Sequence, residues 1–217
     1  MNIAEIASTR HTCKAFDASR RIDAALIDQL RTLLRFAPSS VNSQPWHFII
    51  ASSESGKASI ADTLKANFAY NEPKVRNASH VVVLCARREL DDAHLASILA
   101  QEEKDGRFAT PEARTGQQNT RNFYASLHRD QLQDAPVWMD KQVYLALGSL
   151  MFGAASLGLD ACPMEGIDCA ALDQALGLEE KGLRSVVLLA LGYRSAQDFN
   201  ASLPKSRLSA DVVISEI

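Results

Sequence analysis

Basic residues and hydroxyl side chains gather in two short segments near opposite ends of the chain. The first reads Arg10-His11-Thr12-Cys13-Lys14, and the second reads Leu203-Pro204-Lys205-Ser206-Arg207-Leu208. Charge-assisted hydrogen bonds from arginine and lysine are the strong interactions by which proteins hold phosphate groups. A fold that brings the two segments together could therefore hold a phosphorylated cofactor.

A third segment offers small hydroxyl and amide side chains directly before an apolar stretch. It runs from Pro38 to Trp46 and reads PSSVNSQPW. Such a run exposes hydrogen-bonding groups without bulk. Taken alone it is also an ordinary turn between a helix and a strand, because Ser, Asn and Pro are turn residues. The three segments taken together indicate a cofactor enzyme.

The hydrophobic pattern predicts an alternation of strands and helices that would position these segments. A helix over 22–36, ended by Pro38, leads into the Ser39-Ser40 turn. The other expected elements are a helix over 54–67, a largely helical stretch from 89 to 157, and strands over 47–51, 79–86, 185–191 and 212–215. We expect a single α+β domain over residues 1–217, with a mixed central sheet flanked by helices.

The stretch from Val143 to Leu157 has hardly any polar face. A helix that is apolar all round is buried, and this one is too short to span a membrane. It is therefore expected to be either the central helix of the fold or half of a large subunit interface. Gly148 and Gly153 would let another backbone come close there, although glycine costs about 1 kcal/mol against alanine in a helix.

Composition excludes several classes of function. The net charge of −3 argues against general attraction to nucleic acid or to an anionic membrane. Four cysteines without a CxxC pair and five histidines without HxxxH or HExxH spacing argue against a metal site, and the cysteines are expected as reduced thiols. No secretory signal or membrane span is recognisable, so we expect a soluble, cytoplasmic protein. There is no P-loop, and no GxGxxG follows a strand.

Five segments in order resemble the FMN-dependent nitroreductase family, and the resemblance covers the whole chain. They are the first basic cluster, PSSxNxQPW, the stretch from Gln101 to Pro111, the turn Pro163-Met164-Glu165-Gly166, and the terminal LPKSRL. The resemblance implies an intertwined homodimer with tightly bound FMN at the interface. It also implies a ping-pong cycle in which NADH or NADPH delivers a hydride to flavin N5. Nitroaromatics, nitrofurans, quinones or pteridines would then take two electrons.

The resemblance also assigns residues. FMN would be contacted by Arg10, His11, Thr12, Cys13, Lys14, Pro38, Ser39, Ser40, Asn42, Asn71, Lys74, Pro163, Glu165, Gly166, Lys205, Ser206 and Arg207. The slot for substrate and NAD(P)H would be lined by Lys14, Val41, Asn71, Lys74, Arg107 and Tyr124.

Within this set the implied roles differ. Arg10, Lys205 and Arg207 would hold the phosphate, whereas Lys14 and Lys74 would face the pyrimidine edge, where reduction gathers negative charge. The residues implied to reach the flavin of the partner subunit are Pro38, Ser39, Ser40 and Asn42.

No side chain is expected to act as a general acid or base. Hydride transfer depends on alignment more than on acidity, so Glu165 and Asp168 are not assigned that role. Lys14, Lys74 and Glu165 would tune the flavin, and the Glu165-Gly166 turn would offer a backbone N–H to N5.

Three residues differ from those usual in the family. Tyr124 stands for Phe, Val41 for Thr, and Thr12 for Ser. Because Tyr124 and Val41 differ from the usual residues, the range of electron acceptors stays open. Two alternatives also stay open: another flavin reaction on the same scaffold, such as enone reduction, and a flavin-binding protein that does not turn over.

Overall fold

The computed structural model describes residues 2–217 and contains one four-stranded sheet in the order β1-β2-β4-β3. The strands are β1 (Trp46–Ala51), β2 (His80–Arg87), β3 (Asp160–Met164) and β4 (Leu183–Gly192). All three neighbouring pairs are antiparallel. The long central strands β2 and β4 are buried over most of their length, which explains their near-continuous apolar sequences.

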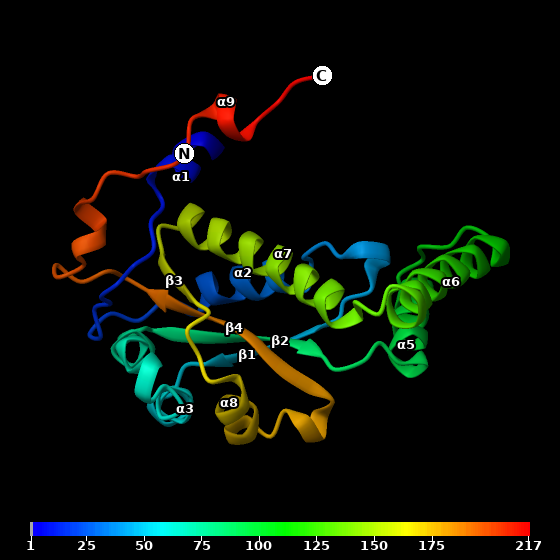
Figure 1. Cartoon of the computed structure of the whole chain (residues 1–217), viewed down its shortest axis with the longest axis horizontal. Helices are drawn as coiled ribbons and strands as arrows, with labels where there is room; N and C mark the ends of the chain where they lie inside the picture. Colours follow the sequence, from blue (N-terminus) through cyan, green and yellow to red (C-terminus); the bar gives the residue numbers. More distant parts are fainter. Residues whose placement is uncertain (1) are drawn as a thin grey trace.

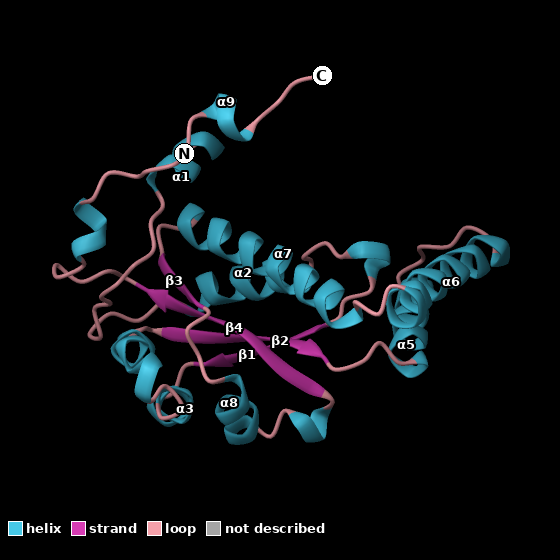
Figure 2. Cartoon of the chain, in the orientation of Figure 1, coloured by secondary structure: helices cyan, strands magenta, loops and turns pink. Residues whose placement is uncertain are grey.

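Helices lie on both faces of the sheet, as Figure 2 shows. The helices are α1 (Ile3–Thr9), α2 (Ala24–Arg35), α3 (Glu54–Ala61), α4 (Glu72–Asn77), α5 (Asp92–Lys104), α6 (Pro111–Ser126), α7 (Ala135–Ser156), α8 (Cys169–Leu176) and α9 (Ala210–Val213). α2 and α7 cover one face, and α3 and α8 cover the other (Figure 1). Successive side chains of a strand point to opposite faces, so Val81 and Val83 join the core under α3 and α8 while Val82 and Leu84 join the core under α7.

α7 is buried on one side only. Trp138, Val143 and Leu150 face the sheet, whereas Tyr144 and Leu145 are exposed. The two glycines of this helix behave differently. A Cβ on Gly153 would lie 2.1 Å from Leu33 Cδ1, so this glycine lets α2 pack closely, but a Cβ on Gly148 would meet nothing within 4 Å. The expected central helix is confirmed, and its second apolar face is open in the single chain.

Two parts of the chain extend away from this body. α5 and α6 form an arm (residues 92–126) that projects to one side (Figure 1). The C-terminal tail, residues 203–217, is exposed throughout, including Leu208, Val212 and Ile214. Among residues 2–217 no helix is both long enough and apolar enough to cross a membrane.

Several expectations from the sequence need correction. The sheet is antiparallel and not mixed, and its parallel contact is an isolated bridge between Thr12 and Ala161. The strand expected at 212–215 is wrong: α9 ends at Val213, and the tail has no neighbouring strand to pair with. The helix expected over 54–67 ends at Ala61. Strand β3 was missed because it has only five residues and includes Pro163, and proline is rare inside strands.

Candidate functional site

The two basic segments meet at one cavity. Arg10, His11 and Thr12 line it from the start of the chain, and Lys205, Ser206 and Arg207 line it from the tail; its volume is about 510 Å³. The Lys205 ammonium group donates a hydrogen bond to the carbonyl of Arg10. The expectation that the fold unites these segments is therefore confirmed at the level of geometry.

Positive charge at this cavity is not neutralised by nearby acids. Within residues 2–217 no carboxylate oxygen lies within 4.0 Å of the side-chain nitrogens of Arg10, Lys205 or Arg207. Desolvation lowers the pKa of Lys205, and the charges of Arg10 and Arg207 lower it further. Such a set of cations fits a phosphate dianion, which would relieve their mutual repulsion.

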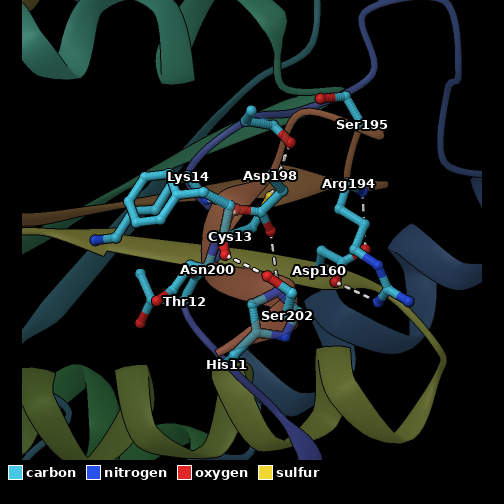
Figure 3. Close-up of polar contacts among 12 residues, drawn as sticks. His11, Thr12, Cys13, Lys14, Asp160, Arg194, Ser195, Asp198, Asn200 and Ser202 are labelled. Carbon is cyan, nitrogen blue, oxygen red and sulfur yellow. Dashed lines mark hydrogen bonds and ion pairs between the residues drawn. The ribbon is translucent and has the colours of Figure 1, made fainter. Parts of the chain in front are cut away.

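The buried carboxylate of Asp198 fixes the backbone of the first segment. Its Oδ1 accepts a hydrogen bond of 2.9 Å from the Lys14 N–H, and its Oδ2 lies 3.0 Å from His11 Nε2. Asn200 Nδ2 donates to the Thr12 carbonyl at 2.7 Å. Figure 3 shows these side chains gathered around Asp198.

Asp198 is ionised in this setting. Burial alone would raise its pKa, but the hydrogen bonds from the Lys14 N–H and the His11 ring outweigh burial, and the pKa is lowered. Sequence reasoning missed Asp198 because an isolated aspartate after a polar stretch reads as a solvated loop residue.

Cys13 contributes little to the cavity. Its side chain is fully buried, the thiol donates to the Ala15 carbonyl at 3.2 Å, and the backbone N–H donates to Ala161 at 3.0 Å. Burial raises the pKa of the thiol, so the side chain is neutral. Of its polar groups only the backbone carbonyl is left for a ligand.

A second group of predicted residues forms a connected set beside the first. Lys74 Nζ donates to Asn71 Oδ1 at 2.7 Å, and Asn71 Nδ2 donates to the Gly166 carbonyl at 2.9 Å. Desolvation lowers the pKa of Lys74, and the nearby charge of Lys14 adds to this. The structure thus joins residues 71–74 to the 163–166 turn and brings both lysines to the same place.

Two tyrosines that sequence reasoning did not single out contact this turn. A Cβ on Gly166 would lie 2.3 Å from the Tyr70 hydroxyl oxygen, so a larger residue there would displace the exposed Tyr70 ring. Tyr144 of α7 donates a 2.6 Å hydrogen bond to Glu165 Oε1. Burial and this contact raise the pKa of Tyr144 to about 12. Glu165 is therefore held against α7 as a hydrogen-bond acceptor.

The loop over residues 38–44 lies elsewhere along α7. The Ser40 N–H donates to Gln142 Oε1 at 2.9 Å, whereas Arg10 and Thr12 share a smaller cavity with Met151 and Ala155. At 1.5 Å of rise per residue, the nine residues from Gln142 to Met151 span about 14 Å. One chain therefore does not bring Pro38, Ser39, Ser40 and Asn42 to the basic cavity.

The remaining two predictions fall on the arm. Arg107, between α5 and α6, is 65% exposed with Nε 4.0 Å from Glu102 Oε1. Tyr124 on α6 is 40% exposed with its ring edge against Phe123. Neither residue reaches the basic cavity in the single chain. In the part of the chain that the structure describes, no group of three or more His, Cys, Asp or Glu side chains is arranged to hold a metal ion.

Comparison with known proteins identifies the family. The nitroreductase family model matches residues 7–193. This chain belongs to the nitroreductase family. Over the full length of both chains it is 49% identical to an oxygen-insensitive NAD(P)H nitroreductase of Salmonella typhimurium. It is 33% identical to the major NAD(P)H-flavin oxidoreductase of Aliivibrio fischeri, over 94% of each chain.

A solved structure confirms the nitroreductase fold. A nitroreductase of Exiguobacterium sibiricum in complex with FMN superimposes with a TM-score of 0.83 at 23% identity. The match covers 100% of this chain and 98% of the other. The α+β, nitroreductase-like fold expected from the sequence is therefore correct, apart from the sheet's antiparallel pairing.

Replacing Asp198 with asparagine should lower the free energy of unfolding by roughly 1–3 kcal/mol at neutral pH, because a charge-assisted set of hydrogen bonds is lost. The folded-state pKa of Asp198 is lowered. Its ionised form therefore stabilises the fold above the unfolded-state pKa of about 4, and this contribution declines as the pH falls through the folded-state value. The difference in free energy of unfolding between wild type and Asp198→Asn, measured by urea unfolding, should therefore decrease from about pH 7 to about pH 3.

Asp130→Asn is the matched control, since Asp130 forms an exposed pair with Arg129. Its effect should stay within about 0.5 kcal/mol. A difference between Asp198→Asn and wild type that does not change with pH would contradict the assignment of an ionised Asp198.

Proposed function

We propose that this protein binds FMN and uses NADH or NADPH to reduce electron-poor acceptors. The observation that carries the proposal is the convergence of Arg10, Lys205 and Arg207, without acidic partners in residues 2–217, on one cavity. The names of the relatives, which are NAD(P)H nitroreductases and an NAD(P)H-flavin oxidoreductase, support the same class of reaction. Nitroaromatics, nitrofurans, quinones and pteridines are the proposed acceptors.

The basic cavity would hold the FMN phosphate. Arginine guanidinium groups bind phosphate through paired N–H donors, and the lysine adds a point charge. The Thr12 and Ser206 hydroxyls lie at the same cavity and can complete the set of donors. Asp198 holds the backbone of residues 11–14 in place, so these donors are ordered before the ligand arrives.

Lys14 and Lys74 would tune the bound flavin. FMN, when bound, would supply the two-electron redox chemistry between the nicotinamide nucleotide and the acceptor. The two ammonium groups supply fixed positive charge near the pyrimidine edge. Lys74 is held by Asn71 Oδ1 and by the Tyr70 carbonyl, so its charge need not reorganise during reduction. The Gly166 turn, tied to Asn71, would set the distance to N5.

The site would be completed by a second copy of this chain. Ser40 is bonded to Gln142, about 14 Å along α7 from Met151, which lines the smaller cavity with Arg10 and Thr12. Ser39, Ser40 and Asn42 would therefore serve the basic site across an interface. The open face of α7, with Val137, Tyr144 and Leu145, offers an apolar surface for such an interface, and the exposed apolar tail offers another. A homodimer with two sites would cover both.

The first test is the visible spectrum of the purified protein, recorded without oxygen before and after NADH or NADPH is added. Flavin absorption that bleaches, followed by turnover with menadione or nitrofurazone, is the expected result. A protein that stays colourless after incubation with FMN would contradict the proposed cofactor. One that binds FMN without being reduced by either nucleotide would contradict the proposed reaction.

Lys14→Ala should lower the reduction potential of the bound flavin by about 30 mV or more, because a positive charge near the reduced pyrimidine edge is lost. Arg207→Ala should instead weaken FMN binding about tenfold, with a smaller change in potential. Potentiometric titration and dialysis separate the two effects. Lys181→Ala, on an exposed lysine that bonds the Leu176 carbonyl, is the control and should change neither.

Leu145→Glu should convert the dimer to a monomer and release FMN, because a charge would be placed on the open face of α7 while the core of the single chain is untouched. Sedimentation equilibrium with flavin absorbance measures both. Leu132→Glu is the control, since Leu132 is equally exposed but lies outside α7. A Leu145→Glu protein that remains a dimer would exclude this face as the interface.

A further inference from the structure

The base of the arm contains a buried ion pair. Arg121 of α6 is 1% exposed, and Glu102 of α5 is 5% exposed. Arg121 Nη2 donates to both carboxylate oxygens of Glu102, at 2.7 and 2.8 Å. Burying two charges is costly unless their remaining donors and acceptors are also satisfied. The arm therefore retains an expensive contact where two apolar side chains would suffice to pack one helix on the other.

The remaining hydrogen bonds of this pair go to the loop over residues 38–44. Arg121 Nε donates to the Val41 carbonyl at 3.0 Å, and Asn42 Nδ2 donates to Glu102 Oε1 at 2.8 Å. Arg121 thus bonds Val41 and Glu102 bonds the adjacent Asn42, and both loop residues are far from the pair in sequence. An apolar pair could join α5 to α6 but could offer nothing to the Val41 carbonyl.

This loop has an unfavourable backbone conformation. Val41, Asn42 and Gln44 have φ values of 48°, 53° and 43°, in the left-handed region. That region is uncommon for non-glycine residues and is strained for a β-branched residue such as valine. Such a conformation persists only where surrounding groups determine it.

Hydrogen bonds within the loop also support this conformation, from the Asn42 N–H to the Ser39 carbonyl and from the Gln44 N–H to Ser39 Oγ, both at 3.0 Å. The ion pair adds contacts from outside the loop, to the Val41 carbonyl and to the Asn42 side chain. The Ser40 N–H is held by Gln142, and His94 Nε2 lies 2.8 Å from the Ser43 carbonyl. These contacts hold the two ends of the bend that residues 39–44 form within this loop. Glu102 and Arg121 hold its centre, where the φ values are positive.

We propose that Glu102 and Arg121 are positioning residues that hold the Ser39–Gln44 bend in its left-handed conformation. The bend then presents Ser39, Ser40 and Asn42 as a preformed surface to the flavin of the partner subunit. This second step rests on the proposed function, whereas the first rests on the contacts alone. The base of the arm is in this way part of the cofactor site, although neither residue touches the basic cavity.

The test compares Glu102→Gln and Arg121→Lys with wild type in the full-length protein. Glu102→Gln keeps the size and an acceptor oxygen but removes the charge. Arg121→Lys keeps the charge but lacks the planar fork that reaches Glu102 and Val41 together. Hydrogen exchange of a peptide covering residues 38–45, measured without FMN, reports the bend. Titration with FMN, followed by quenching of its fluorescence, reports the site.

A matched control exists on the same two helices. Arg114 Nε lies 3.1 Å from Glu103 Oε2, and both side chains are exposed. Glu103→Gln and Arg114→Lys therefore alter an arginine–glutamate pair between α5 and α6 that does not touch the bend. A peptide from β2 serves as the reference for global unfolding.

In the buried-pair variants, exchange over residues 38–45 should rise about tenfold, and FMN should bind about tenfold more weakly. Exchange in β2 and both properties of the control variants should match wild type. Unchanged exchange over 38–45, or acceleration that is equal in β2, would overturn the positioning role. Faster local exchange with wild-type FMN affinity would overturn its link to the flavin. A wild-type protein that binds no FMN would contradict the proposed function, and the exchange rates would still decide whether the pair holds the bend.

Discussion

The buried carboxylate of Asp198 is the contact on which the basic cavity depends. It accepts from the Lys14 backbone and lies against the His11 ring, and its neighbour Asn200 holds Thr12. Desolvation lowers the pKa of Lys205, and the like charges of Arg10 and Arg207 lower it further. Like charges do not gather unless other contacts hold the backbone that carries them, and those contacts must leave the cationic side chains free. Asp198 holds this backbone through the Lys14 N–H and through its contact with the His11 ring.

α7 is the second constraint, because it supports two different parts of the proposed site. Gln142 holds the Ser40 end of the bend, and Tyr144 holds Glu165. The two contacts are close along the helix but belong to different groups of predicted residues. The face between them, with Leu145, is apolar and open. A helix that supports both groups and leaves this face uncovered is suited to meet its own copy, and the proposed homodimer follows from that arrangement.

The core strands and the basic residues could be predicted from sequence, but their connections could not. β2 and β4 are continuous apolar runs, and a run of that kind indicates a strand buried on both faces. Glu102 and Arg121, in contrast, lie in polar helical sequence where charged side chains are normally solvated. Their burial is decided by a loop about 60 to 80 residues away, and no local pattern contains that information. The positive φ of Val41 is likewise opposed to its local preference and is imposed by tertiary contacts.

The buried polar contacts lie at the joints of the proposed cofactor site, and the exposed residues lie where acceptors would enter. Asp198, Asn71 and the Glu102–Arg121 pair are all buried, and each joins segments distant in sequence. Because a buried polar group without a partner is costly, each contact favours a single geometry and restricts motion of the segments it joins. Arg107 and Tyr124, on the arm, are exposed: the Arg107 side chain is 65% exposed, with Nε 4.0 Å from Glu102 Oε1, and Tyr124 is 40% exposed. On the proposed function, the cofactor would thus be held rigidly while the acceptor meets a surface that can adapt. Such a division favours a broad range of flat, electron-poor substrates over strict recognition of one, because selectivity requires fixed polar partners on the substrate side.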